Sequence, residues 1–317
     1  MVYQSLACDF ETNYREGMKH YLSTHSYLNT QTEDLWASLE KSSGKPVGKV
    51  MSTWTGQMGF PVINVQSRVD GNERILTLTQ EKFNADGSSS PDVLWQVPIK
   101  IMSSDGKITE VLMDSKEITV TLDNNGLEWF KVNPNYLGYY RVHYSNEEDL
   151  KRLTPAIEAK TLSEVDRLGI IDDLFALVQA GKASTSDALE MIKAFKANET
   201  SYIVWSSILG FLSKARVIIA HDEDVDEAFQ AFVVDLLENV SEYLGWTAKP
   251  DEHHMTSLLR PLVLTRMGCY GHKPTVDEAT KRFHEHLNGT TLIPADLRGC
   301  VYRYANELLF VKGIIQF

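Results

Sequence analysis

The chain has 317 residues, of which 43% are hydrophobic and 23% charged, and its formal net charge is −12. This length accommodates two or three domains of ordinary size, each with its own hydrophobic core. The acidic charge argues against a nucleic-acid-binding surface, because such affinity rests on Lys and Arg neutralising phosphates. It favours cationic ligands, and only weakly.

The cysteines and the ends of the chain predict a cytoplasmic protein. Cys8, Cys269 and Cys300 lack the spacing of metal ligands and are interpreted as reduced thiols. No apolar run approaches the roughly 20 residues that a membrane helix needs, and the amino end "MVYQSLACDF" shows no secretory leader. Because N-glycosylation takes place in secreted proteins, three matches to its N-x-[ST] motif are interpreted as chance matches. They begin at Asn198, Asn239 and Asn288.

Residues 1 to 58 are predicted to be helical. "NYREGMKHYLSTH" places Met18, Tyr21 and Leu22 at helical spacing, and "TQTEDLWASLEKSSG" runs from a cap at Thr32 to a glycine stop. "SGKPVGKVMSTWTGQMG" then predicts a short helix with an apolar face. That face is formed by Val47, Val50, Met51 and Trp54.

From Gly59 to residue 148 the hydrophobic period changes to two. "PVINVQSRV" and "RILTLTQEKF" flank a turn that contains Asp70 and Gly71, which predicts a β-hairpin. Further alternating stretches follow, and "WFKVNPNYLGYYRVHYS" ends the set. Six or seven short strands in about 90 residues predict a small β-sandwich at 59–148.

The helical period returns at 149 and continues to about 302. "SEVDRLGIIDDLFALVQAG" has Ser163 and Asp166 at capping-box spacing and Gly181 as its stop. Another predicted helix ends at Gly245, and a later one begins at Thr275. The predicted fold class is therefore multi-domain α and β: a short helical segment, a small β-sandwich, and an α-helical array of the solenoid type. No strict sequence repeat accompanies it.

A search for catalytic motifs finds none in this chain. H-E-x-x-H, G-x-S-x-G, C-x-x-C and Gly-rich phosphate loops are all absent. In "FHEHLNG", His284 and His286 are two positions apart, so on a helix they point to different faces and do not share a metal. We therefore predict no catalytic, cofactor-binding or metal-binding residues here.

Two other stretches have simple structural interpretations. "HDEDVDE", from His221 to Glu227, lacks the glycine and the final glutamate of a calcium loop and is interpreted as the amino end of a helix. "GYYRVHY", with Tyr139, Tyr140 and Tyr144, is interpreted as a strand whose tyrosine hydroxyls reach water, in preference to a stacking platform.

An ordered series of segments resembles the zinc aminopeptidases of the gluzincin family, in particular its puromycin-sensitive branch. The longest is "NTQTEDLWASLEKSSGKPVGKVMSTWTGQMGFPVINV", and "EVDRLGIIDDLFAL", "GHKPTVDEATKRFHEHLNG" and "IPADLRGCVY" are others. The resemblance covers roughly residues 9 to 302. It implies that 1–58 is the end of a catalytic domain, with 1–8 unmatched. It further implies a β-sandwich domain at 59–148, a truncated helical domain at 149–302, and an unmatched tail at 303–317.

The resemblance implies removal of amino-terminal residues from peptides by a zinc-bound water. The family's H-E-x-x-H motif and its G-x-M-E-N stretch both lie upstream of the matched segments and are absent here. Tyr3 is the only candidate for the family's transition-state tyrosine, and its surroundings do not match. Because this chemistry needs three zinc ligands and a glutamate base together, we expect a chain that binds no zinc and is inactive alone.

Two alternatives remain open for function. The chain could complement a separate catalytic part in trans, or act as a non-catalytic peptide-binding or interaction module. Peptides are the expected ligands, with no nucleic acid and no membrane. Because the neighbouring part of the catalytic domain is missing, we expect Met51, Trp54 and neighbouring apolar residues to lie on exposed patches and the tail at 303–317 to pack poorly. The chain should then self-associate or be marginally soluble.

Overall fold

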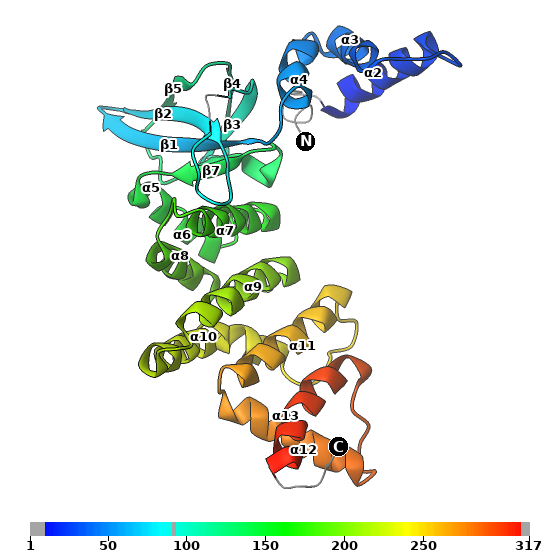
Figure 1. Cartoon of the computed structure of the whole chain (residues 1–317), viewed down its shortest axis with the longest axis vertical. Coiled ribbons are helices and arrows are strands. Elements are labelled where there is room, and N and C mark those ends of the chain that lie inside the picture. Colours follow the sequence, from blue (N-terminus) through cyan, green and yellow to red (C-terminus); the bar gives the residue numbers. More distant parts are fainter. Residues whose placement is uncertain (1–9, 91–92, 312–317) are drawn as a thin grey trace. The chain divides into compact units, whose positions relative to one another are not determined.

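The computed structural model describes residues 10–90 and 93–311, and the side chains of 12–90 and 93–304. The chain separates into two compact units. Unit 1 comprises Met1–Thr154 and Asp172–Ala188, and unit 2 comprises Pro155–Ile171 and Leu189–Phe317. Along the chain, helices are followed by two small sheets and then by a long run of helices (Figure 1). The predicted fold class is confirmed, whereas the domain limits at 58, 148 and 302 stay predictions.

The described part of unit 1 begins with the helices α2 (Phe10–Thr24), α3 (Thr32–Ser43) and α4 (Val47–Thr55). The cap of α3 is Gln31, one residue before the predicted Thr32, because the Asp34 carboxylate accepts a hydrogen bond from the Gln31 amide at 2.9 Å. The predicted stop at Gly44 is confirmed by its φ of +65°, which glycine adopts without steric cost.

The prediction that Met51 and Trp54 lie on exposed patches is wrong for these two residues, which are half-buried. Met51 packs against Leu39 and Val47, and Trp54 packs against the core of the sandwich. The indole N–H of Trp54 donates to the Gln96 carbonyl oxygen at 2.9 Å, which fixes α4 to the sheets. Large apolar side chains that this region does expose are Tyr14 and Leu22 on α2, Tyr27 and Leu28 in the turn after it, and Met58 just after α4.

The sandwich contains a four-stranded sheet in the order β5-β2-β1-β7 and a three-stranded sheet in the order β4-β3-β6. Its strands are β1 (Pro61–Asp70), β2 (Glu73–Lys82), β3 (Val97–Ser103), β4 (Ile108–Met113), β5 (Glu117–Asp123), β6 (Phe130–Val132) and β7 (Arg141–Tyr144). The predicted β1–β2 hairpin is confirmed, and its register places Asp70 opposite Glu73. Alternate residues of both sheets, such as Leu76, Ile99 and Phe130, form one buried core.

The segment from Trp129 to Tyr144 divides into two strands because its middle turns sharply. Asn133 has a φ of +61°, and its side chain accepts from the Gly138 amide at 2.7 Å and donates to the Gly138 carbonyl oxygen at 3.1 Å. This moves the chain from one sheet to the other through the 3₁₀ turn η1 (Pro134–Tyr136). Tyr139 and Tyr140 precede β7, and Tyr140 is only 3% exposed, so the expectation that its hydroxyl reaches water is wrong.

After the sandwich the chain is helical. The elements are α5 (Glu147–Lys151), α6 (Thr154–Glu158), α7 (Glu164–Gln179), α8 (Thr185–Ile192), η2 (Lys193–Phe195), α9 (Tyr202–Ile219), α10 (Glu223–Leu244), α11 (His254–Cys269), α12 (Lys273–Leu287), η3 (Ala295–Leu297) and α13 (Arg298–Val311). Helix α7 contributes its first half to unit 2 and its second half to unit 1. Residues 312–317 of the predicted tail lie outside the described residues.

The predicted helix limits agree with the structure at most positions. The Ser163 hydroxyl accepts from the Asp166 amide at 3.1 Å, as the capping-box spacing predicts, and Gly181 ends α7 with a φ of +66°. Gly245 caps the carboxyl end of α10. The start predicted at Thr275 is late, because α12 begins at Lys273 after a cap at His272.

Helix α9 is long and apolar enough to cross a membrane by length and composition, with a mean hydropathy of 1.4. A third of its residues are buried in the protein, and it packs against α10 and α11 of the same unit. The buried residues are Val204, Trp205, Ile208, Leu209, Phe211 and Leu212. We therefore interpret α9 as a core helix of unit 2.

Helices α2 and α3 approach closely at Gly17, which yields a prediction about stability. A Cβ at Gly17 would lie 2.7 Å from both Leu39 Cδ2 and Ser42 Oγ, whereas a Cβ at Gly210 in α9 would meet nothing within 4 Å. We expect Gly17→Ala to lower the free energy of unfolding of unit 1 by about 1–2 kcal/mol through overpacking. Gly210→Ala should instead raise the free energy of unfolding of unit 2 by up to about 1 kcal/mol, because alanine has the higher helix propensity and meets no clash there.

Chemical denaturation followed by far-ultraviolet circular dichroism measures both variants. Equal effects of the two substitutions would contradict the close approach of α2 and α3.

Candidate functional site

The described residues contain no group of three or more His, Cys, Asp or Glu side chains that could hold a metal ion. His286 lies in the last turn of α12, where its Nδ1 is 3.3 Å from the Thr291 carbonyl oxygen. Asp222 caps α10 by accepting from the Val225 amide at 3.2 Å, as expected for a helix start. Tyr3 lies outside the described residues. The zinc ion that the resemblance implies therefore has no matching ligand set in this part of the chain.

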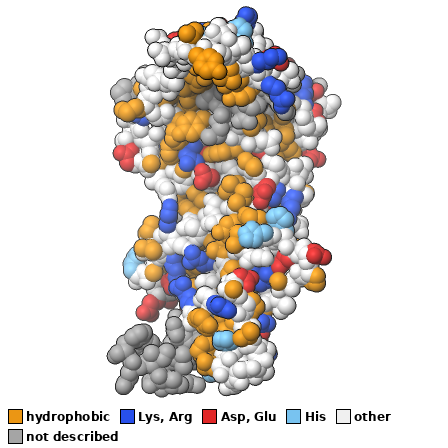
Figure 2. All heavy atoms as spheres, turned by 90° about the vertical axis from the view of Figure 1, so that its right-hand side faces the viewer, with side chains coloured by type: hydrophobic (Ala, Val, Ile, Leu, Met, Phe, Trp, Pro, Cys, Tyr) orange, Lys and Arg blue, Asp and Glu red, His pale blue; other side chains and the backbone are white. Residues whose placement is uncertain are grey.

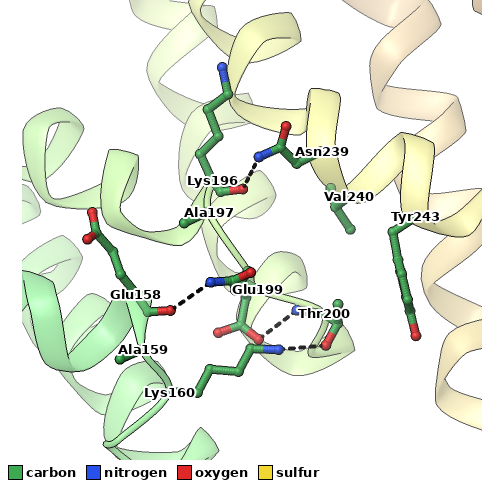
Figure 3. Close-up of a pocket in the computed structure, with 11 residues that line it drawn as sticks. Glu158, Ala159, Lys160, Lys196, Ala197, Glu199, Thr200, Asn239, Val240 and Tyr243 are labelled. Atoms are coloured by element: carbon green, nitrogen blue, oxygen red, sulfur yellow. Dashed lines mark hydrogen bonds between the residues drawn. The ribbon is translucent and has the colours of Figure 1, made fainter.

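A pocket of about 490 Å³ lies within unit 2, between the end of α6, the segment before α9, and α10 (Figure 3). Val240 and Tyr243 of α10 form an apolar wall, and Tyr243 is 50% exposed. Facing them is a polar wall that includes Lys160 and Thr200. The lining residues are Glu158, Ala159, Lys160, Lys196, Ala197, Asn198, Glu199, Thr200, Asn239, Val240 and Tyr243.

The polar wall is held by a buried ion pair. Glu199 accepts from Arg167 of α7 at 2.6 Å (Nε) and 3.2 Å (Nη2), and both residues are at most 6% exposed. The same carboxylate accepts from the Thr200 amide at 2.9 Å and the Ser201 amide at 2.8 Å. It thus satisfies donors at the amino end of α9 that would otherwise be unpaired. The shape of the pocket consequently depends on Glu199.

Side-chain amides join the three segments around the pocket. Asn198 Nδ2 donates to the Glu158 carbonyl oxygen at 3.1 Å, and Asn239 Nδ2 donates to the Lys196 carbonyl oxygen at 3.1 Å (Figure 3). Lys160, which has a φ of +54°, donates from Nζ to Thr200 Oγ1 at 3.0 Å. These bonds fix the relative positions of α6, the segment before α9, and α10.

The chemistry of the pocket suits binding better than catalysis. Its lining includes no His, Cys or Ser, so no nucleophile is paired with an imidazole base. Lys196 is paired with Asp235 at 2.6 Å and Glu238 at 3.6 Å, so its charge is compensated outside the pocket. A polar wall facing an aromatic wall can bind a peptide segment through hydrogen bonds and apolar contact.

Sequence reasoning missed this pocket. Asn198 and Asn239 drew notice only as sequon positions, and nothing local marks Glu158 or Tyr243. The lining comes from three segments that lie about 40 residues apart. Hydrophobic periodicity predicts which face of each helix is buried, but not which helix ends meet.

Comparisons with known proteins assign most of the chain. A family model described as "ERAP1-like C-terminal domain" matches residues 129–308, and one described as "Peptidase family M1 domain" matches residues 2–54. Puromycin-sensitive aminopeptidase of Caenorhabditis elegans is 36% identical over 313 residues, which is 95% of this chain and 33% of that protein. The match to the ERAP1-like C-terminal domain model ends at residue 308, so it extends past Tyr302 into the segment that was predicted to be an unmatched tail.

Other aminopeptidases show the same coverage. Aminopeptidase M1-A of Oryza sativa subsp. japonica is 36% identical over 91% of this chain and 33% of its own length. Glutamyl aminopeptidase of Homo sapiens is 31% identical over 93% of this chain and 31% of its own length. The chain thus spans about a third of the length of the curated relatives it matches.

The match over 129–308 begins inside the sandwich, and a buried polar cluster in unit 1 joins the sandwich to the second half of α7. Asp173 of α7 accepts from the Tyr136 hydroxyl at 2.6 Å, from Arg141 Nη1 at 3.1 Å and from the Val142 amide at 2.9 Å. Arg141 also pairs with Asp172 at 2.9 Å. One carboxylate therefore anchors the η1 turn and strand β7 to a helix.

Burial dominates the electrostatics of this cluster. Removal from water raises the pKa of the Asp173 carboxyl to about 6, although the Tyr136 hydroxyl, Arg141, the Val142 amide and Lys131 all favour its ionised form. Burial likewise raises the pKa of Tyr136, with the neighbouring Asp173 charge acting in the same direction. Tyr136 therefore remains a neutral hydrogen-bond donor at physiological pH.

The raised pKa of Asp173 predicts a pH dependence of stability. Because the folded-state pKa of about 6 exceeds the ordinary value of 3.8, the contribution of Asp173 is complete below pH 3.8 and is lost as pH rises through 6. Relative to Asp173→Asn, the wild-type free energy of unfolding should increase by about 1.4 kcal/mol when pH falls from 7 to 5. Tyr136→Phe removes a donor to the carboxylate and should move this change to higher pH.

Denaturant titrations at several pH values, followed by tryptophan fluorescence, measure the difference. If the free energy of unfolding of wild type and of Asp173→Asn changed equally between pH 5 and 7, the raised pKa of Asp173 would be contradicted.

Proposed function

Because this chain belongs to the M1 family of peptidases and corresponds to the carboxy-terminal part of an aminopeptidase, we propose that it is the non-catalytic portion of such an enzyme. In this proposal it supplies the β-sandwich and helical units and does not hydrolyse peptides alone. Removal of amino-terminal residues from peptides would require a separate zinc-bearing part, in the same or another chain.

The extent of the family match carries this proposal. The Peptidase family M1 domain model matches only residues 2–54, and the chain spans about a third of its aminopeptidase relatives. The sequence contains no H-E-x-x-H, so it lacks the spacing that places two histidines and a glutamate on one helix face. We include the absence of stoichiometric zinc in the proposal.

A cytoplasmic location also belongs to the proposal. Cys269 and Cys300 are both free thiols, and Cys300 is buried, which raises the pKa of its thiol. Unpaired cysteines are typical of a reducing compartment. Cys8 lies outside the described residues.

The purified chain tests the proposal directly. We expect less than one zinc per ten chains by metal analysis, and no hydrolysis of an amino-acid arylamide above the rate of a buffer blank, because the ligands and the base are missing. Hydrolysis that follows the protein peak through two chromatographic steps would overturn the proposed function. Addition of zinc during the assay controls for loss of metal in purification.

A second candidate function is non-catalytic peptide binding, favoured by the pocket of Figure 3. The acids Glu158, Asp235 and Glu238 lie in or beside it and outnumber the lysines Lys160 and Lys196, so electrostatic steering favours cationic peptides, weakly.

Calorimetry with a cationic and an acidic peptide, at low and high salt, tests this second function. We expect binding of the cationic peptide that weakens with salt and falls about tenfold in Tyr243→Ala, since that change removes the aromatic wall. Leu292→Ala, an 85% exposed position elsewhere in unit 2, is the matched control. Equal binding of both peptides, or of both variants, would exclude the pocket as a charge-selective site.

A further inference from the structure

Strand β4 (Ile108–Met113) lies at one edge of the three-stranded sheet and pairs with β3. The Ser103 amide donates to the Lys107 carbonyl oxygen at 2.9 Å, and in an antiparallel ladder the bonded pairs recur at every second residue. The residues that alternate with the bonded ones include Ile108 and Leu112. Their backbone N–H and C=O groups are therefore directed away from β3.

The outward backbone groups of Ile108 and Leu112 lack a partner strand. In the part of the chain that the structure describes, neither residue forms a backbone hydrogen bond on that side. Natural edge strands usually guard such groups with lysine, proline or a bulge. The stretch "ITEVLM" has no lysine or proline and keeps an unbroken register with β3. Its one charged side chain, Glu110, is paired with Lys100 at 2.8 Å.

A second pocket, of about 190 Å³, lies beside β4 within unit 1. Lys45 and Pro46, from the connection between α3 and α4, line it together with residues of β3 and β4 that include Pro98 and Leu112. Side chains two residues apart on a strand share a face, so Glu110 and Leu112 lie on the same face of β4. A strand added to β4 would place the side chain opposite Leu112 next to this pocket.

Apolar exposure alone does not distinguish β4 from the rest of the surface. Ile108 is 42% exposed, but hydrophobic side chains reach the surface in many places on the face shown in Figure 2. Scattered exposed residues of this kind need no explanation. What distinguishes β4 is the combination of outward backbone groups and a flanking pocket. In strand addition, main-chain hydrogen bonds supply affinity and pockets for side chains supply specificity.

The charge of the edge selects among the occupants. Ile108, Glu110 and Leu112 are evenly spaced, so two β4 strands paired antiparallel over their full length would place Glu110 opposite Glu110 of a second copy. Like charges directly opposite each other destabilise a sheet, whereas opposite charges stabilise it. A basic residue at this position of the added strand is therefore favoured over a second copy of the chain.

We propose that β4 binds an extended peptide segment of a partner protein as an added antiparallel strand. The segment carries a basic residue opposite Glu110 and apolar residues opposite Ile108 and Leu112, the latter beside the second pocket. This inference goes beyond the proposed function, because strand pairing requires neither zinc nor hydrolysis. It concerns unit 1 and is separate from the pocket of unit 2.

Peptide titration of the full 317-residue chain, followed by amide nuclear magnetic resonance, gives the test. The probe is the end-blocked peptide Thr-Val-Thr-Lys-Thr-Val-Thr, and the comparison peptide has Glu in place of Lys. We expect the amides of Ile108 and Leu112 to shift and to exchange more slowly with solvent, with a dissociation constant below about 1 mM. The Glu peptide should bind about threefold more weakly.

Matched controls separate backbone pairing from other contacts. N-methylation of the lysine and both valines removes the donors that face β4 and should weaken binding at least about tenfold, whereas N-methylation of the inner threonines should have little effect. Glu110→Gln should make the Lys and Glu peptides bind equally. Tyr243→Ala, which alters the pocket of unit 2, should leave the shifts of the Ile108 and Leu112 amides unchanged.

Each outcome decides the inference. Unshifted Ile108 and Leu112 amides at about 1 mM peptide, or equal weakening by both methylation patterns, overturn strand addition at β4. Equal binding of the Lys and Glu peptides to the wild-type chain overturns the basic preference. A dimer in light scattering that Ile108→Pro abolishes would assign the edge to a second copy instead. Proline is tolerated at the first residue of an edge strand, and circular dichroism verifies that this variant is folded.

Discussion

The Asp173 carboxylate is the interaction on which the organisation of unit 1 depends. It receives the Tyr136 hydroxyl, Arg141 and the Val142 amide, which come from the turn and the strand that end the sandwich. Because Asp173 lies on α7, this single side chain joins the sheets to the first long helix of the helical part. Burial of an ionised carboxylate without these partners would cost several kcal/mol, so the three donors together stabilise the contact between the sandwich and α7.

Buried ion pairs elsewhere in the chain have the same role at helix ends. Glu199 binds Arg167 and receives two amides before α9. Arg260 is fully buried, pairs with Glu252, and donates to the Leu244 carbonyl oxygen at the end of α10. Helix termini leave several backbone groups without intrahelical partners. Charged side chains that satisfy them allow helix ends to be buried, and the pocket of unit 2 is formed at one such end.

Two surface features of the described residues bear on function. The pocket of unit 2 has hydrogen-bonding and aromatic walls without a nucleophile and base, and strand β4 lies at the edge of its sheet beside a second pocket. Trp54 of α4 packs against the core of the sandwich and donates to the Gln96 carbonyl oxygen, which joins the amino-terminal helices to the sandwich within unit 1.

The sequence determined the order of elements, because hydrophobic period and capping residues act over a few positions. The change of period at Gly59, the capping pair Ser163 and Asp166, and the stop at Gly181 are all found where the pattern placed them. The resemblance likewise assigned the family. The tertiary structure alone decided what lies next to what: that Trp54 is covered by the sandwich while Leu22 is not, and that Glu158, Glu199 and Tyr243 line one pocket. Burial and pKa depend on contacts between distant segments, and no local pattern records them.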